Sequence, residues 1–247
     1  MRRLSVLIFA CCLLAPLFAA DAPPLDDRAM DESMLPELKT PVAKEAPKID
    51  GVLDDAAWKE AATSESFALK EGSKAKGRTK VYVTRDNNAL YIAVECFDSE
   101  DALKKLKADA KAHDDDPIWG DDNVELFIDP SGKRENYYQV IINAKGVTWD
   151  AWLPSPLAPD KTWNPDFKSA VKVNKDNWTL EIALPFACFT QSPKSAAVWA
   201  FNVTRMRPNV ELTYWSPVYN DGSHHPEKFG RLSGMPAVVL NGNGEAK

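Results

Sequence analysis

Histidine and cysteine are scarce in this chain of 247 residues, which contains three His and four Cys. No Cys-x-x-Cys-His sequence is present, so c-type haem attachment is excluded. No Gly-x-Ser-x-Gly sequence is present either, which removes the nucleophile motif of the α/β-hydrolases. We also find no internal repeat. These absences remove two specific motifs and leave binding functions open.

Long apolar runs are missing outside the N-terminus. There, Arg2 and Arg3 precede an apolar run over 4–14, and small residues follow at Ala19 and Ala20. This is the pattern of a secretory signal peptide, and it is too short to span a bilayer. We therefore predict export to the periplasm or outside the cell, with 1–20 removed. The sequence before Cys11 matches a lipobox poorly, so no lipid anchor is expected.

Net positive charge is also absent. Without Arg2 and Arg3 the chain has 28 basic and 36 acidic residues, a formal charge of −8. This argues against nucleic acid or an anionic membrane as a partner. Of the four cysteines, Cys96 and Cys188 lie outside the predicted signal peptide. We expect both to be free and buried, since a disulfide would require their Cα atoms to lie within about 7 Å.

The chain divides by composition into an arm, a domain and a tail. Residues 21–46 are rich in Pro and charge and predict a linker or loosely held arm. Residues 47–237 alternate short strand patterns with turns, and 238–247 form a polar tail. The strand patterns predict an all-β domain, an antiparallel β-sandwich of immunoglobulin-like type. One short helical insertion is expected over 101–113.

The most regular pattern is a predicted hairpin over 123–129 and 137–143. Val124, Leu126 and Ile128 should face the core of the sandwich, which places Glu125 on the opposite face. By the same alternation Gln139 should lie beside it. Trp119 precedes the hairpin in an Asp-rich loop. An aromatic ring near a carboxylate and an amide suits a sugar, whose apolar face stacks while its hydroxyls form hydrogen bonds. The alternative is that Trp119 is a core or lid residue and Glu125 a solvated one.

Seven segments in order resemble family 9 carbohydrate-binding modules. They are D-G-V-L-D-D-A-A-W, A-L-Y-I-A-V, W-G-D-D-N-V-E-L-F-I-D-P, Y-Y-Q-V-I-I-N, W-T-L-E-I-A-L-P-F, F-N-V-T-R and F-G-R-L. The resemblance covers about 47–236. It implies a DOMON-like β-sandwich that binds mono-, oligo- or polysaccharides without catalysis. The expected role is accessory to polysaccharide degradation, with glycoside hydrolases of the same system as expected partners.

The resemblance also implies site residues. Trp119 matches the first aromatic of a sugar clamp and Glu125 matches a hydrogen-bond acceptor, while Gln139 stands where some members carry Arg. The second clamp Trp is missing, which leaves other aromatic residues as candidates: His224, His225, Phe229 and, from another loop, Trp163. No cofactor is required, although members bind structural calcium; acidic loop residues that offer hard oxygen ligands are Asp114, Asp115, Asp116, Asp121 and Asp122.

Two other functions compete with sugar binding. The same class of sandwich includes haem-binding electron-transfer domains, for which Met206, His224 or His225 would be the axial ligands. A glycoside hydrolase would require a pair of carboxylates, for which Asp121, Asp122 and Glu125 are the candidates.

Overall fold

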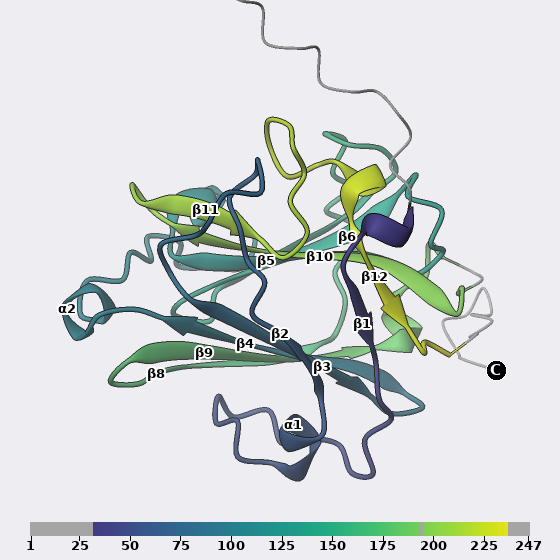
Figure 1. Ribbon diagram of the computed structural model, residues 1–247, viewed down its shortest axis with the longest axis horizontal. Coiled ribbons are helices and arrows are strands. Elements are labelled where there is room, and N and C mark those ends of the chain that lie inside the picture. The colour runs from purple at the N-terminus through teal and green to yellow at the C-terminus, as the bar shows by residue number, and fades with distance from the viewer. Residues whose placement is uncertain (1–31, 193–194, 237–247) are drawn as a thin grey trace, which may run out of the picture.

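Two β-sheets pack face to face in this computed structural model, which describes residues 32–192 and 195–236 (Figure 1). The predicted signal peptide and the C-terminal tail lie outside the described residues. The larger sheet, sheet A, has the strand order β1-β12-β10-β5-β6-β7, with β11 paired to β10. Its strands are β1 Glu37–Lys39, β5 Asn123–Asp129, β6 Tyr137–Asn143, β7 Thr148–Leu153, β10 Val198–Arg207, β11 Glu211–Tyr214 and β12 Gly230–Ser233.

The smaller sheet, sheet B, has the order β2-β3-β4-β9-β8. Its strands are β2 Ala62–Ser64, β3 Thr79–Arg85, β4 Ala89–Phe97, β8 Lys168–Val173 and β9 Asn177–Pro185. Helical pieces are short: η1 Glu32–Met34, α1 Ala56–Lys59, α2 Glu100–Leu103, η2 Asp116–Gly120, η3 Phe186–Cys188 and η4 Pro226–Lys228. The predicted β-sandwich is therefore confirmed. Neighbouring strands are antiparallel except for β1, which pairs with β12 in parallel.

The main core lies between the sheets and follows the alternation of the sequence. Val124, Leu126 and Ile128 of β5 are buried in it, together with the inward residues of β6. Cys96 is buried in the same core, while Cys188 is only half-buried, and both are free thiols. The prediction of two free cysteines is confirmed, but the expected full burial of Cys188 is wrong.

A second apolar layer covers the outer face of sheet A. Phe127, Tyr137 and Trp149 point outward from β5, β6 and β7, and loop residues such as Ile118 and Phe229 pack on them. In Figure 1 the segments that bear these loop residues lie on the far side of sheet A from sheet B. Glu125 and Gln139 occupy this covered face, so the non-core face of the hairpin is largely shielded from water.

Two expectations about segments are corrected. The predicted loose arm contributes β1, whose Leu38 is buried, so the fold begins before residue 47. The predicted helix over 101–113 is helical only in α2. The rest is irregular because carboxylates from beyond the segment accept its backbone N–H groups: Asp122 from Lys107, and Asp121 from Ala110. These bonds replace those that a continuing helix would have made.

Two of the family-like segments meet on the outer side of sheet B. Glu181 of β9 is fully buried, and its carboxylate accepts the backbone N–H of Asp50 and the indole N–H of Trp58 at 2.9 and 2.6 Å. Gly51, with φ of 84°, makes the turn that aims its own N–H at the same carboxylate. Three donors thus compensate the buried charge, and they fix the first turn of the domain onto sheet B.

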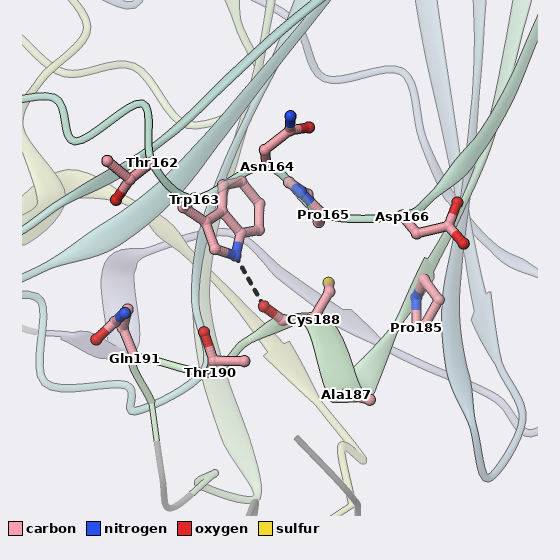
Figure 2. Close-up of a pocket in the computed structure, with 10 residues that line it drawn as sticks. All are labelled: Thr162, Trp163, Asn164, Pro165, Asp166, Pro185, Ala187, Cys188, Thr190 and Gln191. Carbon is pink, nitrogen blue, oxygen red and sulfur yellow. Dashed lines mark hydrogen bonds between the residues drawn. The ribbon is translucent and has the colours of Figure 1, made fainter. Parts of the chain in front are cut away.

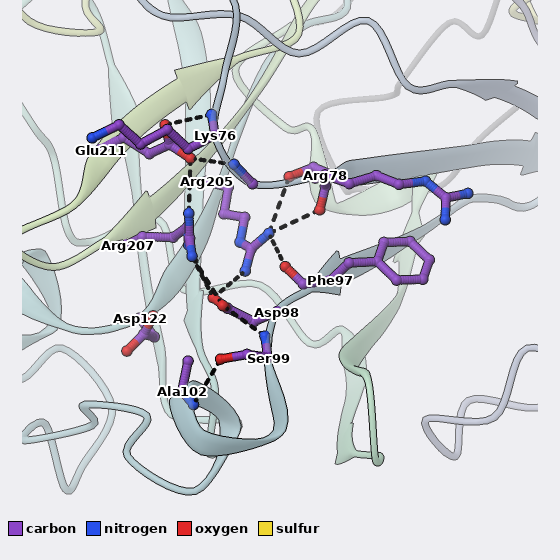
Figure 3. Close-up of polar contacts among 12 residues, drawn as sticks. Lys76, Arg78, Phe97, Asp98, Ser99, Ala102, Asp122, Arg205, Arg207 and Glu211 are labelled. Carbon is purple, nitrogen blue, oxygen red and sulfur yellow. Dashed lines mark hydrogen bonds and ion pairs between the residues drawn. The ribbon is translucent and has the colours of Figure 1, made fainter.

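A polar cluster joins the two sheets at one end of the sandwich (Figure 3). Arg205 of β10 is almost fully buried and donates to the carbonyl oxygens of Arg78 and Phe97, at 3.0 and 3.1 Å. Asp98, which follows β4, lies 3.5 Å from Arg205 and 2.8 Å from Arg207. Sheet A therefore supplies the guanidinium groups, while the acceptors of Arg205 lie in β4 and beside β3 and β4 of sheet B.

Candidate functional site

One row of cross-strand neighbours organises the outer face of sheet A. From edge to edge its members pair in register: Trp149 with Ile141, Ile141 with Glu125, Glu125 with Thr204, and Thr204 with Tyr214. Paired residues on neighbouring strands project to the same face of a sheet. Glu125 is therefore at the centre of the row, with an aromatic residue about 10 Å away on either side, twice the strand spacing.

Trp119 stands over one end of this row. Its ring meets that of Trp149 with centroids 4.8 Å apart and an interplanar angle of 64°. Trp119 is 39% exposed, whereas Trp149 is buried. The short η2 helix, which ends at Gly120, presents Trp119 in this position. The result is an exposed aromatic surface held by a buried aromatic support.

Glu125 and Gln139 form the polar centre of this face. The Gln139 amide donates to Glu125 Oε2 at 2.8 Å, so the predicted proximity is observed. Glu125 is 6% exposed, and burial raises its pKa to about 7, against 4.5 for a solvated Glu. The Gln139 Oε1 atom is buried and has no hydrogen-bond partner in the described structure. The pair thus has acceptor atoms, on Glu125 and on Gln139 Oε1, that a sugar hydroxyl could use.

The loop over 219–229 covers the neighbouring part of the same face. His224 packs edge-on against Phe127, with centroids 5.8 Å apart, and its Nδ1 lies 2.7 Å from the hydroxyl of Tyr137. Burial lowers the pKa of His224. Phe229 is fully buried between Phe127 and Tyr137. His224 is therefore half-buried beside the polar pair, and Phe229 serves the packing of the face.

His225 points away from this aromatic group. Its Nε2 lies 3.0 Å from the carbonyl oxygen of Asp221, and its Nδ1 lies 3.2 Å from Glu227. Both nitrogens are engaged within the loop itself. The structure gives no contact between His225 and the row that contains Glu125.

Tyr219 is a candidate that the sequence interpretation overlooked. Among the described residues, the exposed large hydrophobic side chains include two aromatics, Trp119 and Tyr219, the latter 46% exposed. Its loop returns to the row, because Ser223 Oγ lies 3.4 Å from the Tyr214 hydroxyl. Tyr219 has a positive φ of 56°, uncommon for a residue with a side chain. The family pattern has a Trp at the second clamp position, so it does not point to a Tyr in this loop.

Trp163 lies on the opposite side of sheet A from Glu125, although the sequence made it a candidate for the second clamp residue. It belongs to a Pro-rich loop over 154–166, from which an exposed ring is expected, but it is only 6% exposed, so that expectation is wrong. Its ring packs on the core residue Tyr138 with centroids 4.6 Å apart, and its indole N–H donates to the Cys188 carbonyl at 2.7 Å. Figure 2 shows this bond at the wall of a cavity of about 520 Å³. Trp163 cannot form a clamp with Trp119 across Glu125.

The acidic loop residues serve mainly as acceptors for the chain itself. Asp121 is fully buried and accepts from two backbone N–H groups and from the Asn143 amide at 2.9 Å. Asp122 and Asp115 accept the N–H groups of Lys107 and Lys111. These contacts occupy oxygens that a calcium ion would need. Calcium remains a prediction, and these carboxylates show no convergence that supports it.

The haem candidates are far apart on sheet A. Met206 pairs with Asn123 at one end of β5, whereas His224 packs on Phe127, four residues further along the strand. Four residues of a strand span about 13 Å. Two axial ligands of one haem must approach the same iron atom, so this pair does not suit the group.

The sequence profile described as carbohydrate family 9 binding domain-like matches residues 49–233. The chain belongs to this family. The resemblance predicted from the seven segments is confirmed, and so is the carbohydrate-binding class of function. The matched range includes both sheets apart from β1 and contains Trp119, Glu125 and Gln139.

Relatives of this family 9 domain agree with the assignment. Endo-1,4-beta-xylanase A of Thermotoga maritima is 28% identical over 197 residues, and so is the Thermotoga neapolitana enzyme of the same name. The match covers 75% of this chain but 17% of those enzymes. A family 9 module from Caldicellulosiruptor kristjanssonii, solved with cellotriose, has a TM-score of 0.59 at 17% identity, covering 81% of this chain and 95% of that one. Its glucose complex gives 0.56 at 17% identity, covering 79% and 94%.

None of the described helices has the length and apolar content needed to cross a membrane.

Proposed function

We propose that this family 9 domain binds glucose and the ends of β-1,4-linked glucan or xylan chains at the outer face of sheet A. The observation that carries the proposal is the exposed Trp119, held over Trp149 in the row that contains Glu125. The choice of sugars is supported by the cellotriose and glucose complexes of the similar module and by the xylanases among the relatives.

The binding mode follows from the chemistry of the row. The apolar face of a sugar ring stacks on Trp119, since aromatic rings present an apolar surface of suitable size. Hydroxyl groups on the edge of the sugar donate to Glu125 and to the free Oε1 of Gln139. The loop with Tyr219 and His224 bounds the face on the other side. Affinity is modest, because each sugar hydroxyl exchanges a bond to water for one to protein.

We also propose that binding occurs without catalysis. A glycosidase needs two carboxyl groups, about 5–5.5 Å apart in retaining enzymes and about 6.5–9.5 Å in inverting ones. Asp121, one possible partner, is already occupied by three donors. The raised pKa of Glu125 has burial as its main cause, with no contribution from a second carboxylate. Glu125 is therefore suited to accepting hydrogen bonds beside Gln139.

Export and partners belong to the same proposal. The N-terminal pattern supports secretion. A sugar-binding domain there would serve glycoside hydrolases of the same system. N-terminal sequencing of protein from its native source tests export: a mature chain that begins near Asp21 supports it, and one that begins at Met1 contradicts it.

Isothermal titration calorimetry with a panel of sugars tests the binding itself. The panel contains glucose, xylose, cellotriose, xylotriose and the reduced alcohol of cellotriose. We expect binding of glucose and cellotriose, and the reduced sugar shows whether the closed terminal ring is the part that is recognised. Titrations in which none of these sugars produces heat, at concentrations up to the millimolar range, would contradict the proposal.

A further inference from the structure

A small group of metal-ligating side chains lies on the other flank of sheet A, at the edge formed by β7. His113, Asp114 and Asp150 each present one ligand atom within 4.8 Å of the other two. His113 Nδ1 lies 3.6 Å from Asp150 Oδ2, and His113 Nε2 lies 3.6 Å from Asp114 Oδ1. The imidazole therefore stands between two carboxylates. His113 and Asp150 also line a cavity of about 490 Å³.

Asp150 is the unusual member of this group. It is 1% exposed, and neither of its carboxylate oxygens has a hydrogen-bond donor in the described structure. Most buried carboxylates are hydrogen-bonded or paired, because an uncompensated buried charge is costly. Glu181, equally buried on the other sheet, has three donors. Asp150 thus has the acceptor capacity that a cation would use, and it faces the cavity.

We propose that His113, Asp114 and Asp150 bind one zinc ion. Zinc takes His nitrogen and Asp oxygen at about 2.0–2.2 Å, which puts tetrahedral ligands roughly 3.4 Å apart. Small rotations of the exposed His113 and the half-exposed Asp114 bring the three atoms to this spacing. The fourth position would hold water from the cavity. Calcium suits the group poorly, because it prefers six to eight oxygen ligands.

The surroundings of the three ligands support this choice. Thr148 Oγ1 lies 3.1 Å from His113 Nδ1. A hydrogen bond at Nδ1 orients the imidazole and leaves Nε2 as the nitrogen that would bind zinc. Lys161 Nζ lies 3.8 Å from Asp114 Oδ2, so its positive charge competes with a zinc ion for this carboxylate. Lys161 is on the exposed surface and its long side chain can turn toward solvent. A zinc ion would then replace it beside Asp114.

Zinc binding to the untagged, chelator-treated full-length protein tests the proposal. We expect isothermal titration with ZnCl₂ to give one ion per chain and zinc to raise the melting temperature. Asp150→Asn and His113→Ala should each lower the affinity for zinc. Loss of a residue that only hydrogen-bonds to a ligand lowers metal affinity roughly 10–100-fold, so loss of a ligand should lower it at least as much. Asp109→Asn and His225→Ala, matched changes outside the group, should leave zinc affinity unchanged. Asp150→Asn should melt no lower than the wild type without metal, because it removes a buried charge and keeps the shape.

Three results would overturn the proposal. The first is an absence of zinc binding by the wild type. The second is zinc binding that is equally tight in Asp150→Asn and His113→Ala. The third is competition in which calcium displaces zinc at equal concentration. None of these results depends on sugar binding, so the zinc site and the sugar site fail or stand separately.

Discussion

Trp119 and Trp149 share one contact but have opposite environments: their ring centroids are 4.8 Å apart, yet Trp119 is exposed and Trp149 is buried. Trp119→Ala should therefore abolish measurable sugar binding while the melting temperature changes little. Trp149→Ala should cost about 3–5 kcal/mol of stability, as for other buried aromatics. Calorimetry and thermal melts on both variants check this difference.

Trp163→Ala is the matched control for that pair. Trp163 is buried on the core side of sheet A, against Tyr138. Its loss should lower the melting temperature without altering sugar affinity in the remaining folded protein. Sugar affinity that survives in Trp119→Ala, or that disappears in a folded Trp163→Ala, would place the site elsewhere.

Tyr219 gives a second test of the binding face. If it bounds the site opposite Trp119, Tyr219→Ala should weaken sugar binding about tenfold, within the range of about 0.5–1.5 kcal/mol for an aromatic contact. Stability should be unaffected, because the ring is 46% exposed. Tyr219→Phe should retain binding if the ring acts by stacking. Full affinity in Tyr219→Ala would leave His224 as the boundary of the face.

Glu125 should act on sugar binding through its charge. A hydrogen bond to a charged acceptor contributes about 1.5–3 kcal/mol, so Glu125→Gln should weaken sugar binding roughly 10–150-fold. The pKa of Glu125 is about 7. Affinity of the wild type should therefore rise as the pH increases from 6 to 8, and that of Glu125→Gln should stay constant. Calorimetric titrations at pH 6 and pH 8 measure the sugar affinity of both proteins. If affinity changes with pH to the same extent in the wild type and in Glu125→Gln, Glu125 is not the charged acceptor.

The same group should shape the pH dependence of stability in the absence of sugar. The pKa of Glu125 is 4.5 when solvated and about 7 in the fold. Below pH 4.5 the carboxyl is neutral in both the folded and the unfolded state. Between pH 4.5 and about 7 it ionises only in the unfolded state, so the free energy of unfolding falls as the pH rises. The loss is on the order of 3 kcal/mol by pH 8. Denaturant unfolding at pH 5 and 8 should show that Glu125→Gln is less sensitive to pH than the wild type.

The sequence predicted the parts of the fold that depend on alternation and missed those that depend on contacts between distant segments. Strand period alone put Val124 in the core and Glu125 opposite it, and both positions are observed. Trp163 was misplaced because a Pro-rich loop has no periodicity, and its burial depends on Tyr138 and Cys188. The helix expected over 101–113 failed because Asp121 and Asp122, beyond the segment, accept its N–H groups.

The candidate site shows the same division. Trp119, Glu125 and Gln139 were found because a motif and a strand pattern contain them. Trp149 and Tyr219 were not, because their roles arise from cross-strand register and from the path of a loop. Asp150 was overlooked for a related reason: its neighbours His113 and Asp114 are more than thirty residues away in the chain.

Asp98 should be among the most sensitive positions for stability, although it has no role in the proposed sites. It pairs with Arg207 at 2.8 Å and lies 3.5 Å from Arg205, which is buried between the sheets (Figure 3). Breaking a buried ion pair costs about 3–5 kcal/mol because a buried charge loses its partner. Asp98→Ala should therefore lose about this much in denaturant unfolding. Glu100→Ala, which removes an exposed pair with Lys104, should cost no more than about 0.5 kcal/mol. Similar losses in the two variants would mean that the carbonyl oxygens of Arg78 and Phe97 hold Arg205 without Asp98.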